Sequence, residues 1–217
     1  MKVRASAFMI ICLLLLSMTS FSQEKKTGAA EPKIKKERKT MGTKGKEVAV
    51  VETSMGTFEM ELYRSDAPKT VENFVKLTGK KYFDGMRVHR VAKGFVIQTG
   101  DEKSKDTTRA AEWGSGGQSI YGKDFEDELN PATPSYKEGY KKGVVAMANK
   151  GRNTNSSQFF ICLGDVGLPH NYTIFGKVIK GVDVVEKIGQ VQIVPKMGPT
   201  DGSPKTDVLI KKITMKK

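Results

Sequence analysis

The sequence predicts a mainly β domain, built as an antiparallel barrel with two α-helices covering its open ends. Three observations favour this fold: many short segments have strand-like patterns, turn signals separate them, and only two segments have helical periodicity. A closed barrel also removes exposed strand edges. The length of 217 residues fits one such domain with extensions better than two domains.

The first predicted elements are a hairpin and a helix. Strand patterns at 48–53 and 57–63 are separated by a three-residue turn that ends in glycine. A helix follows, with Pro68 in its first turn, Ser65 or Asp66 as the cap, and Gly79 at its end. Its apolar face consists of Val71, Phe74, Val75 and Leu77.

The remaining elements are mostly strands. The segments with strand patterns are 87–91, 95–99, 144–148, 157–163, 173–179, 191–194 and 208–215. Residues 182–188 predict the second helix. Residues 100–142 are rich in glycine and polar residues and have no strong periodicity, so we expect a long irregular connection there.

Residues 1–22 have the pattern of a secretory signal peptide. Lys2 and Arg4 precede a short apolar run over residues 8–16, and small residues before Gln23 indicate cleavage near Ser22. The apolar run is shorter than the roughly 20 residues that span a bilayer. We therefore expect an exported protein, periplasmic or secreted, and the Lys/Arg-rich signal favours a bacterial one.

Residues 23–46 predict a disordered basic linker between the signal peptide and a domain over residues 47–217. The linker holds nine basic and three acidic residues, so it carries six of the thirteen net positive charges. It could hold the protein weakly at an anionic surface, or it could be a solvated spacer. No nucleic-acid partner is predicted, and a monomer is the expected state.

The cysteines and histidines exclude several kinds of site. Without the signal peptide, Cys162 is the only cysteine, so an intramolecular disulfide cannot form. It lies in an apolar run, which favours a buried structural thiol over a nucleophile. With only His89 and His170 besides, a zinc site is not predicted. Phosphate-loop, zincin and hydrolase signatures are missing too, and no cofactor is expected.

Two long stretches resemble the cyclophilin family of peptidyl-prolyl isomerases. They are H-R-V-x-x-G-F-x-I-Q-x-G-D at 89–101 and M-A-N-x-G-x-N-T-N-x-S-Q-F-F-I at 147–161, and segments 114–128 and 172–178 support them. The resemblance covers about residues 47–217. It implies a closed eight-stranded barrel with two helices, and a cofactor-independent isomerase that assists the folding of exported proteins. A proline-peptide binding module or holdase with weak catalysis is the alternative.

The resemblance also implies a set of site residues. Arg90 occupies the place of the family's catalytic arginine, and Phe95 and Phe160 occupy its proline pocket. Asn149 is expected to hold the peptide backbone, and Gln98 to position Arg90 or the substrate carbonyl. The full set expected to bind proline-containing peptides and unfolded or exported proteins is Phe95, Val96, Gln98, Ala148, Asn149, Gln158, Phe160, Leu168 and Tyr172.

Three positions depart from the family pattern. Gly167 stands where many members have a tryptophan, Tyr172 replaces a pocket histidine, and Val96 replaces a common methionine. A tyrosine keeps an aromatic wall and a donor, so we expect isomerase activity to survive. His89 alternates with Arg90 along the strand and is expected on the opposite face, in a structural role.

Overall fold

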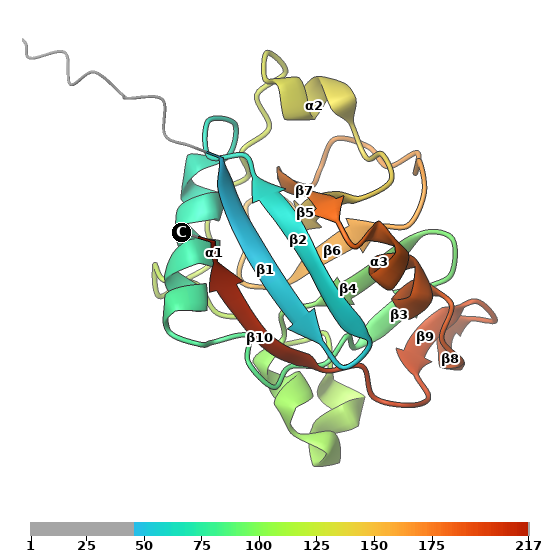
Figure 1. Ribbon diagram of the computed structural model, residues 1–217. Coiled ribbons are helices and arrows are strands. Elements are labelled where there is room, and N and C mark those ends of the chain that lie inside the picture. Colours follow the sequence, from blue (N-terminus) through green and yellow to red (C-terminus); the bar gives the residue numbers. More distant parts are fainter. Residues whose placement is uncertain (1–45, 217) are drawn as a thin grey trace, which may run out of the picture. The chain divides into compact units, whose positions relative to one another are not determined.

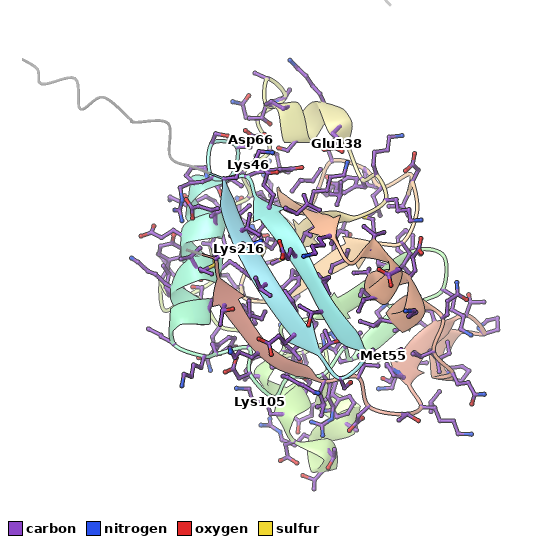
Figure 2. The ribbon with its side chains drawn as sticks, viewed as in Figure 1. Lys46, Met55, Asp66, Lys105, Glu138 and Lys216 are labelled. Carbon is purple, nitrogen blue, oxygen red and sulfur yellow. The ribbon has the colours of Figure 1, made fainter. Side chains whose placement is uncertain are left out.

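The computed structural model describes residues 46–216 of the chain. The predicted signal peptide and the predicted linker, except Lys46, lie outside the described residues. The two ends of the described chain lie close together, since the Lys216 backbone N–H donates to the carbonyl of Val48 at 2.8 Å (Figure 2). Within residues 46–216, none of the helices has the length and apolar character needed to cross a membrane.

Ten strands form one antiparallel sheet in the order β10-β1-β2-β7-β5-β6-β4-β3-β9-β8 (Figure 1). Their bounds are β1 Glu47–Thr53, β2 Gly56–Leu62, β3 Arg90–Ala92, β4 Val96–Thr99, β5 Val144–Met147, β6 Phe159–Cys162, β7 Ile174–Lys180, β8 Ile193–Gly198, β9 Asp201–Pro204 and β10 Ile210–Met215. All the strand segments predicted from the sequence are present, with ends shifted by a few residues. The antiparallel, mainly β fold is confirmed.

The predicted number of strands was wrong, and closure of the barrel is not confirmed. β9 and its pairing with β8 were not expected, because Asp201–Pro204 contains a glycine and a proline, which seldom form strands. This hairpin extends the sheet beyond β3. The order of paired strands therefore ends at β8, which does not pair with β10 at the other end to close a barrel. Near that gap, residues 85–88 bond irregularly to residues 208–210, as in the 2.7 Å bond from the Ile210 N–H to the Met86 carbonyl.

The described residues contain three α-helices rather than the predicted two. They are α1 Pro68–Gly79, α2 Pro134–Glu138 and α3 Val182–Gly189, and two 3₁₀ helices, η1 Glu102–Lys105 and η2 Thr107–Glu112, lie in the long connection. The short α2 was missed because five residues give no helical periodicity. In Figure 1, α1 lies along β10, and α3 lies near β2, β3 and β4.

The cap predicted for α1 was wrong. Ala67 occupies the N-cap position and makes no side-chain bond. Glu128, distant in the sequence, instead accepts hydrogen bonds from the backbone N–H groups of Lys69 (3.0 Å) and Thr70 (2.9 Å). A carboxylate there satisfies orphan donors and lies at the positive end of the helix dipole. The Asp66 carboxylate instead accepts a hydrogen bond from the backbone N–H of Ser135.

Three central strands, β3, β4 and β6, pack against apolar clusters on both faces of the sheet. Consecutive residues of β3, β4 and β6 alternate between a large apolar cluster and a smaller one: Val91, Ile97, Phe159 and Ile161 face the large cluster, whereas Ala92, Val96, Phe160 and Cys162 face the smaller one. The large cluster is the main core, to which α1 contributes. The smaller cluster is where the sequence-predicted site residues gather.

Candidate active site

The β3–β4 hairpin places two predicted site residues directly opposite each other. Arg90 pairs with Gln98, and Gln98 pairs in turn with Phe160 on β6. The turn between the strands requires Gly94, whose φ of 73° lies in the left-handed region. Because paired residues of adjacent strands share a face, an arginine, an amide and an aromatic ring stand in one row across three strands.

Asp201, on β9, holds the guanidinium of Arg90. Its two oxygens accept from Arg90 Nε at 2.9 Å and from Nη2 at 2.7 Å, while Arg90 Nη1 donates to Gln98 Oε1 at 3.2 Å. Such a bidentate pair fixes the plane of the guanidinium. A guanidinium has five N–H groups, so two remain for a ligand. The Arg90 side chain is 27% exposed and can reach one.

A chain of amides orients Gln98. Gln158 Nε2 donates to the carbonyls of Gly114 (3.0 Å) and Gly116 (2.8 Å), and Gln98 Nε2 donates to Gln158 Oε1 at 2.9 Å. Backbone carbonyls only accept hydrogen bonds, so the NH₂ group of Gln158 must face Gly114 and Gly116. A guanidinium only donates, so the oxygen of Gln98 must face Arg90. The loop that contains Gly114 and Gly116 therefore orients the side-chain oxygen of Gln98 toward Arg90, through Gln158.

The predicted proline pocket is the apolar half of the site. Phe160 is buried and its ring meets that of Tyr172 edge to face, with centroids 5.5 Å apart. Phe95 and Leu168 are partly buried against the same cluster, as is Ala148, and Val96 lies within it. All of these predicted residues are therefore brought together on one face.

Tyr140 fixes the position of Tyr172. Its hydroxyl donates to the Tyr172 carbonyl at 2.9 Å and accepts from the Tyr172 N–H at 3.1 Å. Burial raises the pKa of Tyr140 to about 12, so the hydroxyl stays protonated and can make both bonds. Neither this role nor that of Asp201 could be predicted from the sequence, because each is a single polar residue in a segment without a recognisable sequence pattern.

Asn149 uses its side chain within the protein. Its Nδ2 donates to the Asn171 carbonyl at 2.8 Å, and its Oδ1 accepts from the Gly151 N–H at 3.3 Å. These bonds fix the loop and orient the side chain, and the expected contact of Asn149 with a peptide stays a prediction. Its backbone remains beside Ala148, whose N–H donates to the Gln158 carbonyl at 2.9 Å.

His89 and Cys162 are both buried. His89 is 4% exposed, its ring lies next to Gly114, and its pKa is lowered to about 4, mainly by burial. Burial raises the pKa of the Cys162 thiol to about 12, and the cysteine is free. A neutral thiol is a poor nucleophile, so the prediction of a structural cysteine is confirmed.

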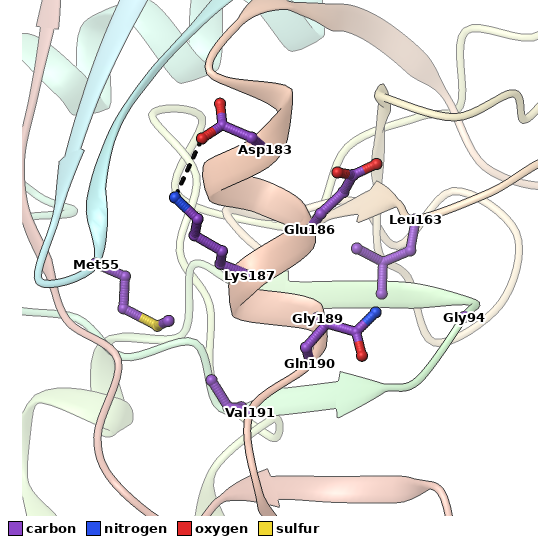
Figure 3. A pocket seen from close by; sticks show the side chains of 9 residues that line it. All are labelled: Met55, Gly94, Leu163, Asp183, Glu186, Lys187, Gly189, Gln190 and Val191. Carbon is purple, nitrogen blue, oxygen red and sulfur yellow. Dashed lines mark hydrogen bonds and ion pairs between the residues drawn. The ribbon is translucent and has the colours of Figure 1, made fainter.

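A cavity of about 720 Å³ lies away from these residues, between the β1–β2 turn and the end of α3 (Figure 3). It is lined by Met55, Gly94, Leu163, Asp183, Glu186, Lys187, Gly189, Gln190 and Val191. Asp183 and Lys187 pair with each other along the helix, at 3.3 Å. None of the predicted site residues lines this cavity.

Comparison with known proteins shows which family the chain belongs to. The family model described as "Cyclophilin type peptidyl-prolyl cis-trans isomerase/CLD" matches residues 48–215. The chain belongs to this family. It is therefore a cyclophilin-type peptidyl-prolyl cis-trans isomerase, as the sequence resemblance predicted.

Relatives of this cyclophilin-type isomerase include eukaryotic proteins. "Peptidyl-prolyl cis-trans isomerase-like 1" of Neurospora crassa is 45% identical over 168 residues, covering 75% of this chain and 90% of that protein. The Homo sapiens protein of the same name is 42% identical over 152 residues, covering 70% and 84%.

Solved structures agree with this assignment. A cyclophilin-type isomerase of Cryptosporidium parvum has a TM-score of 0.68 and 31% identity, covering 80% of this chain and 99% of that one. The same protein was also solved in the presence of the dipeptide Ala-Pro, with a TM-score of 0.66, 32% identity, and coverage of 78% and 99%.

Proposed function

We propose that Arg90 is the catalytic residue of this isomerase and that the smaller apolar cluster binds the proline ring. The observation that carries the proposal is the fixed guanidinium, held by Asp201 and Gln98 with two N–H groups unused. It lies in the same row as Phe160, so a proline seated against that ring would place its nitrogen near the guanidinium.

The chemistry follows from the electronic structure of the amide. An Xaa-Pro bond rotates slowly because its partial double-bond character sets a barrier of about 18–20 kcal/mol. At the twisted transition state conjugation is lost, and the proline nitrogen becomes pyramidal and gains a lone pair. A guanidinium that donates to this nitrogen stabilises the twisted state more than either planar state, which lowers the barrier. No bond is made or broken.

The remaining site residues would hold the peptide. Phe95, Phe160, Leu168 and Tyr172 suit an apolar ring, and Gln98 can orient Arg90 or accept from the substrate. The backbone beside Ala148 and Asn149 offers polar groups for an extended peptide. This binding role is supported by the relative solved in the presence of Ala-Pro.

Isomerisation kinetics of Arg90→Ala test this proposal. Removing a donor to a developing charge is expected to lower kcat/KM on a Xaa-Pro peptide by about 10²–10³-fold. Arg64→Ala is the matched control, because that arginine also pairs with a carboxylate, Glu47, but lies outside the site. Circular dichroism reports the fold of both variants. An Arg90→Ala enzyme with full activity would show that another group carries the reaction.

A second function, binding or holdase activity with weak catalysis, is favoured by one observation. Gly167 is exposed and adds no side chain beside Leu168 and Tyr172, so the pocket lacks the wall that a tryptophan would give. NMR titration with a proline peptide separates the two functions. Strong chemical-shift changes without faster cis–trans exchange would favour the binding module.

We also propose that the enzyme is exported and acts on proteins outside the cytoplasm. The support is the signal-peptide pattern of residues 1–22. Expression of the full chain with a C-terminal tag in a bacterial host tests it. Export predicts a periplasmic product whose measured mass matches a chain that begins at Gln23. A cytoplasmic product whose mass matches a chain that begins at Met1 would contradict the proposal.

A further inference from the structure

A cleft of about 570 Å³ adjoins the candidate active site. Two of its lining residues, Asn149 and Tyr172, belong to that site. The others are Asp127, Leu129, Lys150, Gly151, Arg152 and Asn171. A peptide whose proline lies against Phe160 and Tyr172 would therefore pass this cleft within one or two residues, since an extended chain advances about 3.3–3.6 Å per residue.

The cleft presents unused hydrogen-bond donors. Arg152 and Asn171 are exposed, and within residues 46–216 their side chains make no hydrogen bond or ion pair. Lys150 adds a second positive charge, while its Nζ donates to the Ser115 carbonyl at 2.9 Å. A guanidinium with all its N–H groups free is suited to bidentate binding of a carboxylate.

The nearby acidic side chains are engaged with other partners. Asp127 Oδ2 accepts from the Asn153 N–H at 2.8 Å, and its Oδ1 accepts from Asn155 Nδ2 at 2.8 Å. Glu128 caps α1, and Glu126 pairs with Lys69. None of these carboxylates is bonded to Arg152. Among the residues that line the cleft, Lys150 and Arg152 are positive and Asp127 is negative.

Leu129 and Tyr172 give the cleft an apolar part. Tyr172 is fixed from behind by Tyr140, and both Leu129 and Tyr172 are half-buried. A ligand that matches the cleft needs a short aliphatic stem for these walls and an anionic end for Arg152. Among peptide side chains, glutamate has this combination.

We infer that this cleft is an accessory subsite that binds a glutamate side chain of the substrate, within two residues of the Xaa-Pro pair, through Arg152. The inference rests on the proposed function of the adjoining site. It makes Arg152 a specificity-determining residue, which sets sequence preference and leaves the rotation step itself to the active site.

Paired peptides with glutamate or glutamine at each of the two positions on either side of the Xaa-Pro pair test the inference. Glutamine has the same shape without the charge. At one position, the wild type should show a kcat/KM about two- to fivefold higher for glutamate, the range expected of an exposed ion pair. The ratio should fall toward one at high salt.

Variants assign the preference to Arg152. Arg152→Gln should abolish the glutamate preference, and Arg152→Glu should reverse it, while activity on the glutamine peptides stays unchanged. Lys211→Gln, which removes one positive charge from the exposed face of β10, should keep the wild-type ratio. Equal rates on both peptides at every position, or a preference that persists in Arg152→Gln, would overturn the inference.

The two proposals fail in different ways. A failed active-site proposal appears as full activity in Arg90→Ala on every peptide, and the glutamate-to-glutamine ratio remains measurable in that enzyme. If the subsite proposal fails, the ratio of kcat/KM for the glutamate and glutamine peptides is one, while the activity of the enzyme still depends on Arg90. Amide chemical shifts of Gly151 and Asn171 give a binding readout that needs no catalysis.

Discussion

The guanidinium of Arg90 is confined from two sides, and each contact comes from a different part of the chain. Asp201 approaches from β9 and Gln98 from β4, so the side chain cannot rotate away without breaking three hydrogen bonds. This preorganisation matters because a donor already in place costs no rearrangement at the transition state. At the scale of single residues, Asp201 is thus a positioning residue for the proposed reaction.

The role of Asp201 can be tested with Asp201→Asn. The amide keeps the shape but loses the charged bidentate pair, a contact of about 1.5–3 kcal/mol, so kcat/KM should fall by roughly 10-fold or more. Asp201→Glu should recover part of the loss. Asp207→Asn breaks another aspartate–arginine pair, with Arg87 at 2.6 Å, and should leave kcat/KM unchanged. Wild-type kinetics in Asp201→Asn would remove the positioning role.

Among the elements, those with a regular pattern could be predicted and those fixed by distant contacts could not. The strand pattern of 87–99 predicted β3 and β4, and helical periodicity predicted α1. β9 escaped because its residues have low strand propensity, and it forms only because β3 and β8 offer edges to pair with. Asp201 was missed along with it, so two of the three hydrogen bonds of the Arg90 guanidinium could not be predicted from the sequence.

The cap of α1 is another contact between distant elements. Glu128→Ala should lower the free energy of unfolding by about 1–2 kcal/mol, because two helix N–H groups lose their acceptor and the dipole loses its anion. Urea denaturation measures the change. Glu126→Ala is the matched control: it removes an exposed ion pair with Lys69, which is worth at most about 1 kcal/mol. Equal effects of the two substitutions would show that Glu128 acts as a surface charge only.

At the scale of the whole molecule, the sheet separates two functions. Its large cluster supplies the main core, whereas its smaller cluster carries the proposed proline pocket, so one set of strands supports both. His89, directly before Arg90 in the sequence, is buried with its ring next to Gly114. It stays neutral because burial lowers its pKa to about 4.

This histidine couples the stability of the whole fold to pH. In the unfolded chain it binds a proton below its ordinary pKa of about 6.5, whereas the folded protein binds one only near pH 4. Falling pH therefore favours the unfolded state, by up to about 3 kcal/mol between these two values. The charge of Asp101 opposes the shift, and those of Lys196 and Arg90 reinforce it.

Urea denaturation of the wild type and His89→Leu at pH 7.5, 5.5 and 4.5 measures this coupling. Carboxylates titrate in both proteins, so their contribution cancels in the comparison. The wild type should lose stability faster than the variant as the pH falls below 6.5, and the difference should grow by roughly 1.4 kcal/mol per pH unit until near pH 4. Packing of the new leucine can change the free energy of unfolding of the variant, but that change is the same at every pH. Parallel curves would show that His89 is protonated equally in both states, and burial of this histidine would then not be the cause of acid sensitivity.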